Sequence, residues 1–137
     1  MRYMVTVSRI LISVVLVLSA VSFIAAQKPV RIKFARGATH ANVSGTLNGY
    51  RDKRDFVIKV RAGQTLKTEQ VILRKGGGAI TIYITDPSGG PGGDADMSCN
   101  NRHEITPTIA GDYQIQVVEC PKADRWRGTF RFKITVK

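Results

Sequence analysis

The chain has 137 residues, with 21 Lys and Arg against 10 Asp and Glu, a formal net charge of +11 and 43% hydrophobic residues. This length favours one domain and excludes a large multidomain enzyme. Two cysteines exclude a metal centre built on four, and the hydrophobic fraction excludes an intrinsically disordered chain. The excess of cations predicts an anionic partner: nucleic acid, an anionic glycan, acidic lipid or an acidic cleft on a protein.

The first 26 residues have the pattern of a cleaved signal peptide. Arg2 and Arg9 precede an apolar run from Ile10 to Ile24, and small residues then favour cleavage after Ala26. As a helix this run would span about 22 Å, less than the roughly 30 Å hydrocarbon core of a bilayer. The alternative is an uncleaved membrane anchor. We expect a periplasmic or secreted protein with no membrane contact after cleavage.

Residues 27–137 are predicted to form one domain. Removing Arg2 and Arg9 from the +11 leaves +9, so the signal peptide explains little of the basicity. Cys99 and Cys120 both remain, and in an oxidising compartment an even pair predicts one disulfide. Closing a loop of about 22 residues would stabilise the fold by about 3 kcal/mol. Two free thiols are the alternative.

The domain has the period-two alternation of half-buried strands, rich in β-branched and aromatic residues. Clear candidates are Val30–Phe34, Phe56–Val60, Ala79–Thr85, Tyr113–Val117 and Phe130–Lys137, with weaker ones at Val43–Leu47 and Leu66–Leu73. Turn signals such as Asn48-Gly49 and Ala62-Gly63 separate them. The expected fold is all-β: a small antiparallel β-sandwich of seven to eight strands.

Two irregular stretches interrupt this pattern. Asp86 to Pro107 is rich in Gly and Asp and shows no strand pattern, and Glu119 to Gly128 joins the last two strands. A loop as long as the first stretch is usually functional or mobile. A Cys99–Cys120 disulfide would hold the two stretches side by side at one end of the sandwich.

The sequence contains no clear motif for a catalytic or metal site. Asp86, Asp94 and Asp96 resemble a calcium loop only weakly, because no closing bidentate Glu follows at the required spacing. The two histidines, His40 and His103, lack a partner in a recognisable catalytic or zinc motif. We expect no enzymatic activity, no cofactor and no bound metal.

Most cations of the strands have a structural explanation. They fall on the polar face, where charge aids solubility and protects sheet edges from aggregation. They are Arg31, Lys33, Lys59, Arg61, Lys67, Arg131 and Lys133. Phe130 and Phe132 alternate with two of them but share one face with Ile134 and Val136, which indicates core rather than a base-stacking platform. Nucleic acid is therefore not an expected partner.

Tyr50 and the segment Asp124–Arg127 remain as candidates for binding. Tyr50 follows the Asn48-Gly49 turn, which places its ring at a loop tip, and Trp126 lies between Arg125 and Arg127. Tyr, Trp and Arg carry much of the energy at protein interfaces. Trp126 could equally close the open end of the sandwich.

Val30 to Gln64 resembles the opening of the periplasmic inhibitors of g-type (goose-type) lysozyme. The matching positions are Phe34, Gly37, Ser44, Gly45, Gly49, Tyr50, Phe56, Gly63 and Gln64. The resemblance resumes at Gly111–Tyr113, at Ala123–Arg125 and along Phe130–Lys137. Residues 67–109 depart from the family pattern, as does the cysteine pair.

The resemblance implies a sandwich similar to the pre-peptidase C-terminal domains and an inhibitory function. In the family, loop Tyr and Arg side chains contact the acidic active-site cleft of the enzyme, and these map onto Tyr50 and Arg125. We therefore expect a g-type lysozyme as protein partner, with Trp126, Arg127 and Lys122 as secondary contacts. The alternative is a non-catalytic module that binds an anionic glycan or cell-envelope polymer through its basic face.

Overall fold

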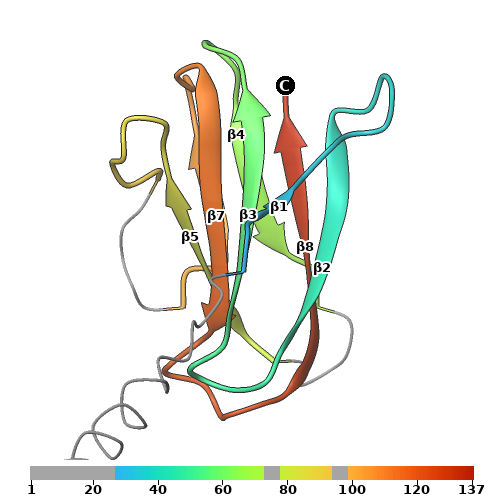
Figure 1. The fold of residues 1–137 in the computed structure, drawn as a ribbon, viewed down its shortest axis with the longest axis vertical. Helices are drawn as coiled ribbons and strands as arrows, with labels where there is room; N and C mark the ends of the chain where they lie inside the picture. The colour runs from blue at the N-terminus through green and yellow to red at the C-terminus, as the bar shows by residue number, and fades with distance from the viewer. Residues whose placement is uncertain (1–26, 73–77, 94–98) are drawn as a thin grey trace, which may run out of the picture.

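The computed structural model describes residues 27–72, 78–93 and 99–137 (Figure 1). It contains eight strands: β1 Val30–Arg31, β2 His40–Leu47, β3 Lys53–Val60, β4 Leu66–Gln70, β5 Ile80–Thr85, β6 Arg102–Ile105, β7 Gly111–Glu119 and β8 Gly128–Val136. The predicted signal peptide lies outside the described residues. Within the described ranges, no helix has the length and apolar character needed to cross a membrane.

The strands form two four-stranded sheets, packed face to face as a sandwich. The orders are β1-β3-β7-β5 and β2-β8-β4-β6, so from β2 to β8 each strand lies in the opposite sheet from the one before it. All ladders are antiparallel except the short parallel one between β1 and β3. The all-β sandwich predicted from the alternating pattern is therefore confirmed.

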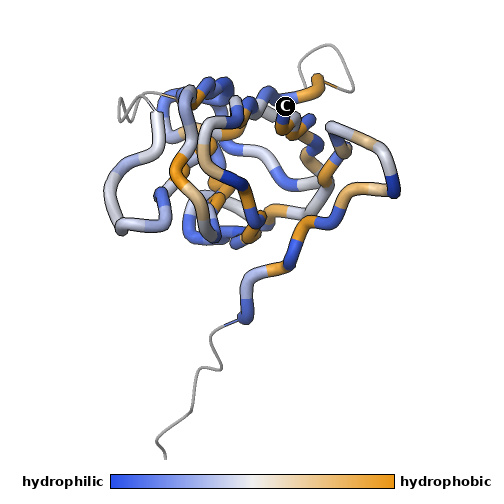
Figure 2. The backbone as a smooth tube through the Cα atoms, turned by 90° about the horizontal axis from the view of Figure 1, so that it is seen from above, coloured by the Kyte–Doolittle hydropathy of each residue, from blue (hydrophilic) through white to orange (hydrophobic). Residues whose placement is uncertain are grey.

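The core lies between the two sheets. It consists of every second residue along the strands, whose side chains face inward. In β7, Tyr113, Ile115 and Val117 are at most 1% exposed, while their neighbours face solvent. Phe56 packs edge-on against Phe130 and Phe132, at centroid distances of 6.3 and 5.6 Å. Viewed from above, hydrophobic and hydrophilic positions alternate along the strands around this interior (Figure 2).

The seven strand cations named above are all exposed, as their polar-face positions predict. The burial of Phe130, Phe132 and Ile134, each at most 2% exposed, confirms that this face of β8 is core. Two of the seven cations also make long-range ion pairs: Lys67 lies 2.9 Å from Glu104. Arg31 donates two hydrogen bonds to Asp112, of 3.0 and 2.7 Å. The Arg31–Asp112 pair links the short β1 to the start of β7.

Sequence-based assignments are wrong at three places, one of which is the strand predicted over Leu66–Leu73, since β4 ends at Gln70. Asp86 to Pro107 was predicted to lack strands, yet β6 lies within it; its four residues pair with β4 and bury His103, which a short polar segment does not reveal by alternation. The first strand was predicted to reach Phe34 but ends at Arg31. Ile32 and Phe34 instead pack against the core as the chain crosses from one sheet to the other.

The alternation of sheets places several connections at one end of the sandwich. Residues 48–52 join β2 to β3, and residues 120–127 join β7 to β8 at the same end, the lower end in Figure 1. The start of β5 and the segment before β6 lie there too, because the amide of Cys120 donates to the carbonyl of Ala79 and that of Ile82 donates to Asn100, each at 2.9 Å. The candidate binding residues lie at this end.

Candidate functional site

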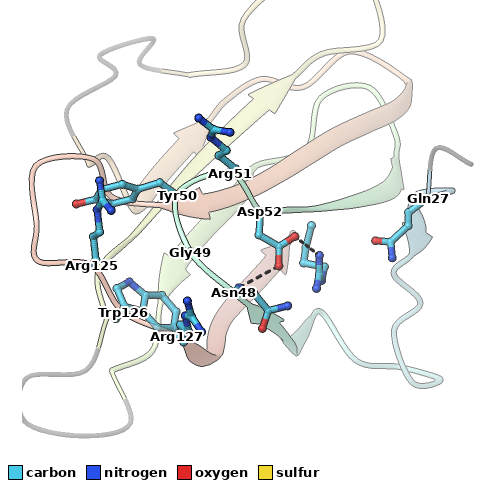
Figure 3. A pocket seen from close by; sticks show the side chains of 10 residues that line it. Gln27, Asn48, Gly49, Tyr50, Arg51, Asp52, Arg125, Trp126 and Arg127 are labelled. Atoms are coloured by element: carbon cyan, nitrogen blue, oxygen red, sulfur yellow. Dashed lines mark hydrogen bonds and ion pairs between the residues drawn. The ribbon is translucent and has the colours of Figure 1, made fainter. Parts of the chain in front are cut away.

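A hollow of about 1070 Å³ lies between the connections 48–52 and 120–127 (Figure 3). Its lining comes mainly from these two connections, with one residue from β3 and one from the start of the domain. The lining residues are Gln27, Asn48, Gly49, Tyr50, Arg51, Asp52, Arg54, Arg125, Trp126 and Arg127. Four of the five residues predicted to bind a target are among them.

Tyr50 and Arg125 are in direct contact, although 75 positions separate them in the sequence. The guanidinium carbon of Arg125 lies over the Tyr50 ring, 4.8 Å from its centroid, which is a cation–π arrangement (Figure 3). The Tyr50 hydroxyl donates a 2.7 Å hydrogen bond to the carbonyl of Ala123. Tyr50 nevertheless stays 39% exposed. The two side chains thus form one preformed, cationic projection, the Tyr50–Arg125 pair.

Asp52 holds the turn that carries Tyr50. Its carboxylate accepts hydrogen bonds from the amides of Asn48 and Lys53, at 3.0 and 2.9 Å, and from the guanidinium of Arg54 at 2.6 Å. Partial burial raises the pKa of Asp52, but the bonds from Asn48 and Arg54 outweigh it and lower the pKa below its ordinary value. Asp52 is therefore ionised at neutral pH and fixes the shape of the turn.

Trp126 anchors the other connection. Its indole nitrogen donates to the carbonyl of Ala79 at 3.2 Å, and its ring packs on the core. Gly78 lies directly against the ring, and the site of a Cβ there is already occupied by indole atoms. The Trp126 amide donates to Glu119 at 2.7 Å. Trp126 thus closes this end of the sandwich while its edge lines the hollow.

The remaining predicted binding residues differ in position. Arg127 lines the hollow together with Arg51 from the opposite connection. Lys122 is exposed but does not line the hollow. With Arg54 and Arg125, four arginines line it, against one carboxylate, Asp52, among the lining residues. Because Asp52 already pairs with Arg54, the surface presents net positive charge to a partner.

The predicted disulfide between Cys99 and Cys120 is confirmed. Its Cα atoms lie 4.8 Å apart, within the usual range. It joins the segment before β6 to the end of β7, one residue beyond Glu119. The two irregular stretches are therefore linked beside the binding end.

Metal and catalytic groups are not expected from the sequence. Residues 27–72, 78–93 and 99–137 contain no cluster of three or more His, Cys, Asp or Glu suited to a metal ion. Asp94 and Asp96, two members of the weak calcium candidate, lie outside the described residues. His103 is 5% exposed, with its Nε2 2.6 Å from the carbonyl of Ile82, which fits a role in the core.

No protein-family model matches the sequence, and no curated protein is similar to it. Among solved structures, the periplasmic inhibitor of g-type lysozyme from Aeromonas hydrophila is similar, with a TM-score of 0.61 and 20% identity over 80% of this chain and 96% of that one. The Salmonella Typhimurium inhibitor gives 0.57 and 18%, over 82% of this chain and all of the other. A mutant of the Escherichia coli inhibitor gives 0.54 and 18%.

This chain has the fold of those inhibitors. The resemblance inferred from the sequence motifs is therefore confirmed at the level of the fold. Identities of 18–20% show a shared architecture, and the contacts of this chain with a target are argued below from its own residues.

Several residues of this site were not predicted from the sequence: Arg51 and Arg54 in its lining, and the supporting residues Asp52, Glu119 and Gly78. Asp52 carried a weak signal, since Asp is common in turns and follows Asn48-Gly49 closely. Glu119 carried a stronger one, because it falls on the inward face of β7, where the alternation requires an apolar residue. Gly78 carried none beyond its place at the end of a glycine run, since its contact with Trp126 joins distant segments.

Proposed function

We propose that this protein is a periplasmic or secreted inhibitor of a g-type lysozyme, and that the Tyr50–Arg125 pair enters the enzyme's active-site cleft. The observation that carries the proposal is the pair itself: an exposed aromatic ring and a guanidinium already stacked at 4.8 Å, on a surface lined by arginines. The fold shared with inhibitors of this enzyme class supports it.

The chemistry of a glycosidase cleft suits such a pair. Glycosidases carry carboxylates that flank the scissile bond and walls that hold sugar rings. A guanidinium can form charge-assisted, bidentate hydrogen bonds with a carboxylate, and a tyrosine ring can pack where a sugar would lie. The inhibitor needs no catalytic group of its own, because occupying the cleft is sufficient.

Preorganisation strengthens this mode of binding. The hydrogen bond from Tyr50 to Ala123 and the stacking of Arg125 hold both side chains before the partner arrives. Less side-chain entropy is then lost on association. Arg127 and Lys122 add positive charge around the pair, and Trp126 contributes the edge of its ring.

The test is inhibition of a purified g-type lysozyme by wild type, Tyr50→Ala and Arg125→Ala. A charge-assisted hydrogen bond contributes about 1.5–3 kcal/mol, so we expect Arg125→Ala to weaken inhibition by roughly 10- to 100-fold. Tyr50→Ala removes both the ring and the support of Arg125, and we expect a loss at least as large.

Arg61→Ala is the matched control. It removes the same charge from an exposed arginine just after β3, at the opposite end of the sandwich, and should inhibit like wild type. If wild type leaves the lysozyme fully active at micromolar concentration, the proposed function is wrong. Salt-sensitive binding to anionic peptidoglycan would then favour the glycan-binding alternative.

A further inference from the structure

Glu119 is a buried acid at a position where the strand pattern requires an apolar residue. It follows Tyr113, Ile115 and Val117 on the inward face of β7 and is 2% exposed. Burying a carboxyl group is unfavourable unless hydrogen bonds compensate, and natural proteins break local rules of this kind mostly at functional sites. The residue therefore requires an explanation beyond packing.

Among the described residues, the one hydrogen bond of its carboxyl group leads to the binding end. Glu119 Oε1 accepts the amide of Trp126 at 2.7 Å, which closes the connection 120–127 on itself. The Trp126 ring is then held over Gly78, with its indole nitrogen on the carbonyl of Ala79.

This bond fixes the backbone between two arginines of the hollow. Arg125 directly precedes Trp126 and Arg127 directly follows it. Arg125 must be held at this point for its guanidinium to lie over Tyr50. Among the described residues, the other backbone bond within this connection is a long one, 3.3 Å, from the Ala123 amide to the Cys120 carbonyl.

We infer that Glu119 is a positioning residue: its buried carboxylate holds the Trp126 amide so that Arg125 and Arg127 face the partner in a fixed geometry. The inference rests on the proposed function and adds to it a residue that never touches the enzyme. A substitution of Glu119 should therefore change inhibition more than it changes stability. Replacing the carboxyl by an apolar side chain removes a buried polar group as well as one hydrogen bond, and these two effects on stability oppose each other.

The experiment compares Glu119→Leu and Glu119→Gln with wild type. Gln keeps an oxygen that can accept the Trp126 amide, whereas Leu fills the space without an acceptor. We expect Glu119→Leu to change Tm by about 5 °C or less, yet to raise the inhibition constant for g-type lysozyme about tenfold or more. Glu119→Gln should inhibit within about threefold of wild type, since the acceptor remains.

A second readout does not depend on lysozyme. Trp126 is the single tryptophan of the chain, so fluorescence excited at the red edge, where tyrosine does not absorb, reports on this connection alone. Acrylamide should quench Trp126 more strongly in Glu119→Leu than in wild type, and to the wild-type extent in Glu119→Gln.

The outcomes separate the two proposals. Failure of wild type to inhibit overturns the proposed function, whereas the quenching series decides whether Glu119 holds the connection. Wild-type inhibition and quenching in Glu119→Leu would overturn the inference. So would a Glu119→Leu protein that fails to fold, because Glu119 would then be a residue of the fold rather than of the site.

Discussion

At the scale of single residues, the contact between Gly78 and Trp126 decides whether the binding end can close. The ring occupies the space where any larger residue at position 78 would put its Cβ. A side chain there would push the indole away from the Ala79 carbonyl and displace the neighbouring arginines with it.

We therefore expect Gly78→Ala to destabilise the protein by about 1–3 kcal/mol, the usual cost of overpacking a well-packed region. Urea denaturation followed by circular dichroism measures the change. Gly90→Ala is the control, since its Cβ would meet only the end of the Asp86 side chain, at 3.3 Å. Equal stability of Gly78→Ala and wild type would show that the ring can shift without loss.

The residue scale is also where sequence reasoning had most difficulty. Tyr50 and Arg125 were predicted as binding residues because their residue types are those of interfaces and because a family resemblance covered them. Glu119 and Gly78 act through contacts with Trp126, and no local pattern states which distant residue a glycine or an inward-facing acid will meet.

At the scale of elements, the turn between β2 and β3 depends on the charge of one carboxylate. Asp52 has a pKa lowered in the folded protein by hydrogen bonds from Asn48 and Arg54, which outweigh the effect of partial burial. A carboxylate of this kind stabilises the folded state at pH values above its pKa in the unfolded protein. This contribution is lost as the pH falls through its pKa in the folded protein.

We expect wild type to be more stable than Asp52→Asn at neutral pH, and the difference to shrink as the pH falls below about 3.9, the ordinary pKa of Asp. Thermal unfolding of both proteins across this range measures it. The comparison cancels the similarly lowered pKa values of Asp86 and Asp112, which are common to both proteins. A difference that is independent of pH would mean that the amide serves the turn as well as the carboxylate.

Most of the elements themselves could be predicted. Strands with one buried and one exposed face carry their period in the sequence, and β3, β5, β7 and β8 were found for this reason. β6 was missed because its four residues, Arg102–Ile105, contain two charged side chains and a buried histidine. Its strand conformation comes from pairing with β4 rather than from its own pattern.

At the scale of the whole molecule, the disulfide connects parts of the fold that the sheets alone do not join. Cys99 and Cys120 close a loop with a sequence separation of 21 that contains the segment before β6, β6 itself and β7. A cross-link of this length restricts the unfolded chain and stabilises the folded one.

Removing it with Cys99→Ser and Cys120→Ala together should lower the free energy of unfolding by about 2–4 kcal/mol. Guanidinium denaturation of the double variant and of wild type, with and without reductant, measures the loss. Reduced wild type serves as the control, because it should unfold at the same lower denaturant concentration as the variant. An unchanged midpoint in both would show that the sheets already supply the stability of this end.

The order of the strands was beyond prediction from the sequence. Alternation predicts that a strand has one buried face, but it does not state which sheet receives the strand. The contact between Tyr50 and Arg125 depends on that assignment, since both connections must cross between sheets at the same end.

The connections that cross between the two sheets can change in evolution with little effect on the core. The backbone ladders and most of the buried residues lie in the strands, whereas most of the groups that would meet a partner lie in two short connections between the sheets. Insertions or exchanges in residues 48–52 and 120–127 can alter what is bound while leaving most of the core in place. Binding selectivity can thus evolve at a different rate from the fold. The two connections could also be grafted onto a homologous sandwich without changing its sheets.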